Sequence, residues 1–171
     1  MDVGAHFLHQ GLIYALAGFS VEAFNLPTTF RKEKVRSLAS AYGIKLNVAE
    51  ELQSGDCFNH LPDNSVDIFL FTEILEHIAF NPVAFWEAVY RIMKPGARIV
   101  VTTPNYYSVT GRAWNLRRFL NGMGGGISID DIIMQNTYGH HWKEFSMKEV
   151  QNYFNLLSPD FKCIKSVYTD D

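Results

Sequence analysis

The sequence of 171 residues predicts an α/β fold in which a mostly parallel sheet is flanked by helices. Short apolar runs alternate with segments whose apolar residues recur at helical spacing, a pattern typical of repeated strand–helix units. The clearest strand covers residues 66–71, and the clearest amphipathic helix follows Pro82. A composition of 47% apolar and 19% charged residues is ordinary for a globular protein, so we expect a single domain over residues 1–171.

In the first half of the chain we expect three short strands separated by two helices. The strands are expected at residues 1–3, 20–24 and 46–48, and the helices at residues 8–16 and 28–42. Gly4 turns the chain after the first strand. Thr28 or Thr29 can cap the second helix, and Gly43 can end it.

The second half continues the alternation. Strands are expected at residues 66–71, 98–103 and 161–168, and helices at residues 82–93 and 146–157. Ser146 and Glu149 have the spacing of a capping box at the start of the last helix. Residues 104–142 lose clean periodicity, and so long an insertion in a compact domain is usually a lid or a substrate loop.

Charge and targeting signals exclude several classes of function. A formal net charge of −3 does not provide the excess of positive charge that is typical of nucleic-acid-binding proteins. The chain shows no signal peptide, and its most apolar run is too short to span a membrane, so we expect no membrane partner. Cys57 and Cys163 stand alone, which favours a cytoplasmic protein. The sequence leaves a homo-oligomer open.

Ligands of open parallel sheets bind at the carboxyl ends of the strands, so the residues just after each strand carry the functional signal. Gly4 would let the backbone approach a ligand, although any strand–helix turn accepts glycine. Asn25 could bond a ribose hydroxyl, or it could be a turn residue. Asp56 could accept a hydrogen bond from an adenine amino group, or it could be an exposed loop residue. Glu76 and His77 lie where a reacting substrate would be, or they start a helix and pack in it.

Four segments follow one another in an order and spacing that match a known family: 61–67 (LPDNSVD), 73–78 (EILEHI), 91–97 (RIMKPGA) and 102–105 (TTPN). They resemble the Rossmann-like class I S-adenosylmethionine-dependent methyltransferases of the type 11 or UbiE-like group. In that family an LP-x-x-S-F-D entry, a LEH turn and an R-x-L-K-P-G-G segment recur at nearly this spacing. The later run 139–146 (GHHWKEFS) resembles the family's GH-x-R-x-F-T segment.

The resemblance implies S-adenosyl-L-methionine as the cofactor and methyl transfer as the reaction. The positions that match the family's cofactor site are Asp2, Gly4, Ala5, Asn25, Asp56, Cys57, Thr72 and Glu73. It also implies a sheet that is incomplete at both ends, because the family's first strand begins earlier and a seventh strand normally follows.

Two positions depart from the family pattern. Residues 4–8 keep one glycine of the usual three, and His6 or Leu8 could fill the space of the cofactor's carboxylate tail. Asn25 replaces the usual acidic ribose ligand, a loss of about 1.5–3 kcal/mol, or roughly tenfold to a hundredfold in affinity. The departures favour an alternative, a catalytically silent methyltransferase-like module that acts in binding or assembly.

Methyl transfer to a hydroxyl needs a base, and we expect His141 or His77 to supply it, with His140 next. Each of these histidines could instead be structural. The 104–142 insertion would build the site for a small-molecule or glycan-type acceptor. Its expected substrate-binding residues, chosen for stacking and charge, are Tyr106, Tyr107, Trp114, Arg117 and His140.

Other chemistries fit less well. The adjacent pairs Glu76-His77 and His140-His141 lack the i, i+4 spacing that puts two ligands on one helix face, so no metal site is expected. The glycines at 124–126 lack the Lys-Ser/Thr of a phosphate loop. A nicotinamide oxidoreductase would share the sheet, but it needs a G-x-G-x-x-G loop and a downstream acid, and neither is present.

Overall fold

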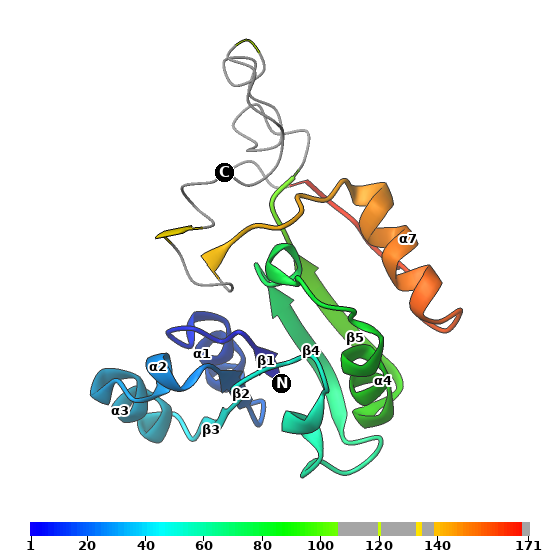
Figure 1. Ribbon diagram of the computed structural model, residues 1–171. Coiled ribbons are helices and arrows are strands. Elements are labelled where there is room, and N and C mark those ends of the chain that lie inside the picture. Colours follow the sequence, from blue (N-terminus) through cyan, green and yellow to red (C-terminus); the bar gives the residue numbers. More distant parts are fainter. Residues whose placement is uncertain (106–119, 121–132, 135–138, 169–171) are drawn as a thin grey trace. The chain divides into compact units, whose positions relative to one another are not determined.

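The structure is a computed structural model that describes residues 1–105, 120, 133–134 and 139–168. It contains a five-stranded sheet in the order β3-β2-β1-β4-β5 (Figure 1). The strands are β1 (Asp2–Val3), β2 (Glu22–Asn25), β3 (Lys45–Val48), β4 (Val66–Thr72) and β5 (Met93–Thr102). Every neighbouring pair is parallel, which confirms the predicted α/β class.

The chain divides into two units, each described by itself. Unit 1 comprises Met1–Thr72 and Phe80–Thr102 and holds the whole sheet; unit 2 comprises Glu73–Ala79 and Thr103–Asp171. The helices of unit 1 are α1 (His9–Leu16), α2 (Pro27–Phe30), α3 (Glu33–Ala41), the 3-10 turn η1 (Asp56–Phe58) and α4 (Val83–Ile92). The described helices of unit 2 are the 3-10 turn η2 (Leu75–His77) and α7 (Met147–Leu157).

Three expected elements differ in the structure. The helix expected at residues 28–42 is two helices, because Lys32 adopts an extended backbone between α2 and α3. β5 begins at Met93 rather than residue 98, and its pairing with β4 is irregular between Val66 and Ile68. Residues 161–168 form no strand; their side chains are mostly exposed and lack the alternating burial of a sheet strand.

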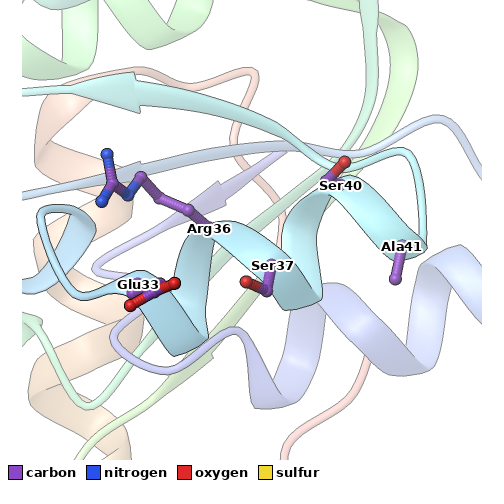
Figure 2. A pocket seen from close by; sticks show the side chains of 5 residues that line it. All are labelled: Glu33, Arg36, Ser37, Ser40 and Ala41. Carbon is purple, nitrogen blue, oxygen red and sulfur yellow. The ribbon is translucent and has the colours of Figure 1, made fainter.

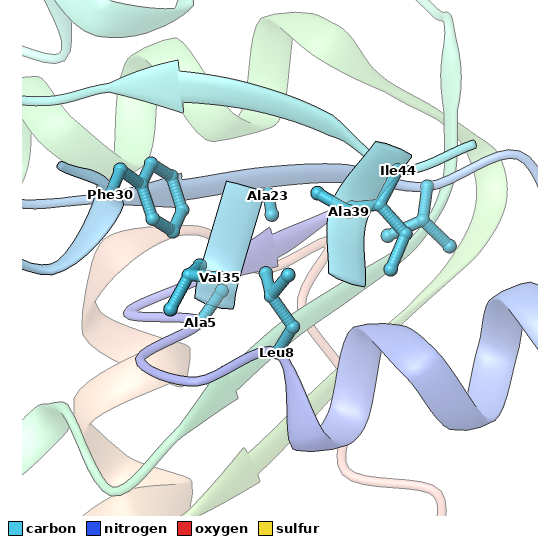
Figure 3. Close-up of a cluster of buried hydrophobic side chains, with 8 residues drawn as sticks. Ala5, Leu8, Ala23, Phe30, Val35, Ala39 and Ile44 are labelled. Carbon is cyan, nitrogen blue, oxygen red and sulfur yellow. The ribbon is translucent and has the colours of Figure 1, made fainter. Parts of the chain in front are cut away.

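One face of the sheet is covered by α1 and α3. Ala23 of β2 points into a cluster with Leu8 at the start of α1 and with Val35 and Ala39 of α3 (Figure 3). Small residues at Ala23 and Ala39 allow the helix to approach the strand closely. Leu8 is fully buried at the centre of this layer, so the turn after β1 is built into the core.

The opposite face carries a layer of aromatic rings. Phe69 and Phe71 of β4 are fully buried and pack against Phe85 and Trp86 of α4, with ring centroids 5.4–6.4 Å apart. Phe58 of η1 joins the layer at 5.7 Å from Phe85. Burying one such side chain contributes about 1.5–3 kcal/mol. These contacts fix α4 and η1 against the strand that the sequence predicts most clearly.

Among the described residues, no helix is both long and apolar enough to cross a membrane.

Gly55 marks a close approach between η1 and α4. Its φ of +74° lies in the left-handed region, and a Cβ built there would lie 2.5 Å from the Cβ of Ala88. Gly43 has a similar φ of +65° but nothing within 4 Å of a built Cβ. Substitution would therefore strain the backbone at both glycines, but only at Gly55 would the new side chain also clash with a neighbour.

We expect Gly55→Ala to destabilise the protein more than Gly43→Ala does. Backbone strain costs each variant about 1 kcal/mol, and overpacking against Ala88 adds about 1–3 kcal/mol at residue 55 alone. Urea unfolding measures both losses. Adding Ala88→Gly should recover part of the loss in Gly55→Ala, whereas equal losses in the two alanine variants would contradict the close approach.

Candidate functional site

The carboxyl ends of three strands meet at one edge of the sheet. Val3, the last residue of β1, lies opposite Phe24 of β2 and Phe71 of β4. Asn25, Gly4 and Thr72 therefore lie side by side at this edge, in that order across β2, β1 and β4. β1 lies between β2 and β4, and the order in which successive strands are added to the sheet reverses there, which is the usual ligand position in open α/β sheets.

The turn after β1 keeps a glycine-like backbone with only one of the three glycines. Gly4, His6 and Leu8 all have positive φ, at 75°, 42° and 68°. These are the three positions at which the resembled family carries glycine. The backbone nitrogens of Gly4 and Ala5 both donate to the carbonyl oxygen of Phe24, at 3.0 and 3.1 Å, which ties the turn to β2.

The two replaced glycines send their side chains to different surroundings. Leu8 is buried among apolar side chains of α3 and the sheet, and His6 is exposed. The Leu8 side chain therefore belongs to the core on the α1–α3 face, as Figure 3 shows. A left-handed conformation at a residue other than glycine costs about 1–2 kcal/mol. Strain of this kind gathers at functional sites, where surrounding packing enforces it.

Asp2 supports this turn from within the core. Its side chain is 1% exposed, and Oδ2 accepts a hydrogen bond from the backbone nitrogen of Gly11 at 3.0 Å. Burial raises the pKa of Asp2, and the Gly11 hydrogen bond opposes that rise. A Cβ at residue 11 would lie 3.2 Å from Oδ2, so glycine allows α1 to sit this close to the carboxylate.

Asn25 has one amide atom engaged and one without a partner. Oδ1 accepts from the backbone nitrogen of Leu26 at 2.7 Å, which sets the orientation of the side chain. Nδ2 is buried and has no hydrogen-bond partner among the described residues. An unpaired buried donor of this kind costs about 1–3 kcal/mol unless a ligand or water accepts from it.

The predicted adenine loop forms η1. Asp56 accepts from Asn59 through Oδ1 at 2.9 Å, and its backbone nitrogen donates to the Ser54 hydroxyl. Cys57 is half-buried, and burial, reinforced by the negative charge of Glu51, raises the pKa of its thiol to about 12. The Cys57 thiol is therefore protonated at neutral pH and weakly nucleophilic.

Two hollows on the surface of unit 1 lie away from these residues. One is formed on α3 by Glu33, Arg36, Ser37, Ser40 and Ala41 (Figure 2). The other lies between residues 51–54 and 81–87. Neither hollow includes a residue that the sequence assigns to the cofactor.

Unit 2 brings together a carboxylate and three histidines. Nδ1 of His77 lies 2.9 Å from the carbonyl oxygen of His140, and the backbone nitrogen of Trp142 donates to the carbonyl oxygen of Glu76 at 2.7 Å. The rings of His77 and His141 meet edge to face, with centroids 4.7 Å apart. Two turns that are more than 60 residues apart in sequence therefore form one cluster, which we call the histidine cluster.

Glu76 lies at the base of the histidine cluster and is 1% exposed. Its Oε2 accepts from the hydroxyl of Thr103 at 3.0 Å. Its Oε1 lies 3.9 Å from Nε2 of His77 and has no hydrogen-bond partner among the described residues. Burial, with a smaller contribution from the charge of Glu73, raises the pKa of Glu76 to about 7, although the Thr103 hydrogen bond opposes the rise.

The remaining predicted residues fall into two groups. His140 is 4% exposed, its ring meets Trp142 at 5.2 Å, and its Nδ1 has no hydrogen-bond partner in the described part of the chain. Glu73 is exposed and has a positive φ of 54°, so it makes a strained turn directly after Thr72. The predicted substrate residues Tyr106, Tyr107, Trp114 and Arg117 lie outside the described residues.

Two contributors to the histidine cluster go beyond what the sequence predicts. Thr103 is expected only as part of a strand, yet its hydroxyl orients Glu76. Glu76 is expected beside the substrate and on the far side of the cofactor, but without a catalytic role. Its position directly before a histidine and after a buried strand is the signal that points to one.

Comparison with known proteins matches one segment of the chain to a family. The model of a family described as a methyltransferase domain matches residues 17–101, which span β2 to β5. The match covers 85 of the 171 residues, so this segment resembles a methyltransferase domain. No curated protein matches the chain at a significant level.

Solved structures share this fold at low sequence identity. A SAM-dependent methyltransferase from Archaeoglobus fulgidus aligns with a TM-score of 0.57, 17% identity and 91% of this chain. A complex between the Haloferax volcanii Trm112 methyltransferase activator and a methyltransferase aligns with a TM-score of 0.59, 16% identity and 91% coverage. This chain spans 58% of the length of each of these two. A structure described as PigF with SAH aligns with a TM-score of 0.55 and 18% identity, and the alignment covers 91% of this chain and 48% of that one.

Beyond the matched segment, the histidine cluster is followed by the capped start of α7. Ser146 and Glu149 form the predicted capping box, in which each side chain accepts from the other's backbone nitrogen. Lys143 adds an ion pair to Glu149 at 2.8 Å. The Lys143 hydrogen bond, and then that of the Ser146 backbone, lower the pKa of Glu149 to about 2.

We expect the contribution of Glu149 to stability to depend on pH. Its pKa is lower in the folded state than its ordinary value of 4.5, so the stabilisation is complete above pH 4.5 and is lost as the pH falls towards 2. Because Glu149 is about half exposed, Glu149→Gln should cost less than about 1 kcal/mol at pH 6 and nothing near pH 2. Chemical unfolding at both pH values measures the difference. A loss that is the same at both pH values would contradict this ion pair, as would a full further loss when Lys143→Gln is added.

Proposed function

We propose that the protein is an S-adenosylmethionine-dependent methyltransferase that transfers a methyl group to a small-molecule or glycan-type acceptor. The carboxyl edge of the sheet carries this proposal, because it combines a glycine-like turn at residues 4–8 with a buried, unpaired donor on Asn25. Three of the solved structures with this fold are described as methyltransferases or with SAH, which supports the same reaction.

The residues at this edge fit an adenosyl cofactor. The turn at Gly4 and Ala5 would lie beneath the methionine part, and Asn25 Nδ2 would donate to a ribose oxygen. Asp56 and Cys57 would flank the adenine, with Thr72 and Glu73 on the opposite side. Asp2 would act indirectly, since its carboxylate accepts from Gly11 and supports the turn.

The cofactor, when bound, supplies a methyl group on a positively charged sulfur, which is already activated for displacement. The chain therefore has to hold the acceptor in line and take up its proton. Alignment of this kind is worth up to roughly 7–11 kcal/mol of the barrier.

His77 and His141 are the proposed bases for a hydroxyl acceptor. A hydrogen bond from Nδ1–H of His77 to the His140 carbonyl would leave Nε2 of His77 as the proton acceptor. The edge-to-face contact with His141 holds the two rings against each other. His140, whose Nδ1 is buried without a described partner, is proposed to contact the acceptor.

The acceptor class rests on residue types in the 104–142 insertion, where aromatic and arginine side chains suit a sugar or a planar ring. Another structure with this fold is described as "Conversion of a Disulfide Bond into a Thioacetal Group during Echinomycin Biosynthesis", which is in keeping with a small molecule. The alternative is a catalytically silent module, which is favoured by the side chains at His6 and Leu8 and by the missing ribose carboxylate.

We expect the protein to bind S-adenosylmethionine with a dissociation constant tighter than about 100 μM, or about 5.5 kcal/mol. Asn25→Asp should tighten binding roughly tenfold, because a carboxylate gives charge-assisted hydrogen bonds to the ribose hydroxyls. Asn25→Ala should weaken it. Isothermal titration calorimetry measures all three affinities.

The matched control is Asn81→Asp. Asn81 also accepts from a backbone nitrogen, that of Val83 at 3.1 Å, but it lies at the start of α4 and is exposed. Its substitution should leave the affinity within about twofold of wild type. No heat with any variant would favour the silent module. Unchanged binding in Asp56→Ala would remove η1 from the proposed adenine site.

A further inference from the structure

The histidine cluster presents three ligand atoms of the kind that transition metals bind. One carboxylate oxygen of Glu76 and one ring nitrogen each of His77 and His141 all lie within 4.8 Å of one another. Glu76 is buried and the two histidines are half-buried, so the fold holds the group and leaves the histidines partly exposed. All three residues belong to unit 2.

We propose that Glu76, His77 and His141 form a binding site for a divalent transition-metal ion such as Zn²⁺. Two imidazoles and one carboxylate are a set found in catalytic zinc sites, where a fourth position stays open for water or substrate. The proposal does not depend on cofactor binding or on methyl transfer. A metal ion on Nε2 of His77 would occupy the lone pair that the proposed base uses, so the ion-bound cluster would not act as that base.

The first supporting observation is the unsatisfied oxygen of Glu76. Thr103 occupies Oε2, but the buried Oε1 has no hydrogen-bond partner among the described residues and faces Nε2 of His77 at 3.9 Å. A buried carboxylate oxygen without a donor is costly, and a metal ion satisfies it directly.

The second observation is the support behind His77. Ligand histidines usually donate their other ring N–H to a carbonyl or carboxylate, which fixes the tautomer that ligates. Nδ1 of His77 lies 2.9 Å from the carbonyl oxygen of His140 and can make this bond. Thr103 supports Glu76 in the same way. Two of the three proposed ligands therefore have an outer partner that orients them.

The geometry requires a small closure. Bonds of about 2.0–2.2 Å to a tetrahedral zinc ion put neighbouring ligand atoms roughly 3.3 Å apart. The 3.9 Å separation between Glu76 and His77, and the 4.8 Å limit on the whole set, therefore require the rings to turn inward by about 1 Å. The sequence showed no sign of this site, because spacing along one helix reveals only ligands on that helix. The three proposed ligands come from two turns that tertiary contacts bring together.

The experiment is titration of the purified chain with ZnCl₂ by calorimetry, and with CoCl₂ by visible absorption. We expect one high-affinity site and the d–d bands of Co²⁺ bound by nitrogen and oxygen. His141→Ala and Glu76→Gln should each weaken binding at least about tenfold, as loss of a ligand does. Glu76→Gln retains the side-chain volume, so it tests the site even if the alanine variant folds poorly.

His60→Ala is the matched control. His60 also lies beside a carboxylate, with Nε2 3.6 Å from Glu22, but both side chains are more exposed, at 43% and 28%. Its substitution should leave Zn²⁺ affinity unchanged. Wild-type affinity in folded His141→Ala or Glu76→Gln, or no Zn²⁺ heat at all, would overturn the site and leave a proton-sharing cluster. Calorimetry with S-adenosylmethionine on the same samples reports the cofactor site separately.

Discussion

The packing of β4 is the constraint on which the rest of unit 1 depends. Phe69 and Phe71 are fully buried against α4, while β4 pairs with β1 on one side and β5 on the other. A strand enclosed in this way cannot shift its register, because a one-residue slip would turn both rings to the opposite face. The ends of β1 and β4 are therefore held level, and the turns that follow them start from fixed positions at the carboxyl edge.

The histidine cluster is stabilised in a different way. Polar contacts join its two turns, among them the His77–His140 hydrogen bond, the Trp142–Glu76 backbone bond and the Thr103–Glu76 bond. Buried polar contacts of this kind are directional, so they specify an arrangement of side chains more than they add stability. A proton, an acceptor hydroxyl or a metal ion would each find oriented nitrogen and oxygen atoms there.

Most of the fold could be predicted from sequence because its signals are local. Alternating apolar runs located all five strands, and the Ser146–Glu149 spacing located the start of α7. The break at Lys32 could not be predicted, since the sequence offers no proline or glycine there. Residues 161–168 look like a strand in composition, yet a strand needs a neighbour, and pairing is not a local property.

The candidate site could be predicted less completely, for a physical reason. Gly4, Asn25 and Thr72 could be aligned in advance because parallel strands bring their carboxyl ends to one edge. The grouping of Glu76 with Thr103 and His141 depends on tertiary contacts between distant turns, which spacing along one helix does not reveal. The free amide nitrogen of Asn25 also follows from its contact with Leu26 and not from its residue type.

The turn after β1 can adopt its observed backbone only when the surrounding core is folded. Glycine would allow this shape in an isolated peptide, but His6 and Leu8 resist it, and burial of Leu8, worth about 1.5–3 kcal/mol, offsets the strain. The turn at residues 4–8 therefore forms only together with the core cluster that holds Leu8. Any loosening of α3 against the sheet therefore also loosens the turn at residues 4–8, so the shape of this turn depends on the stability of the whole layer.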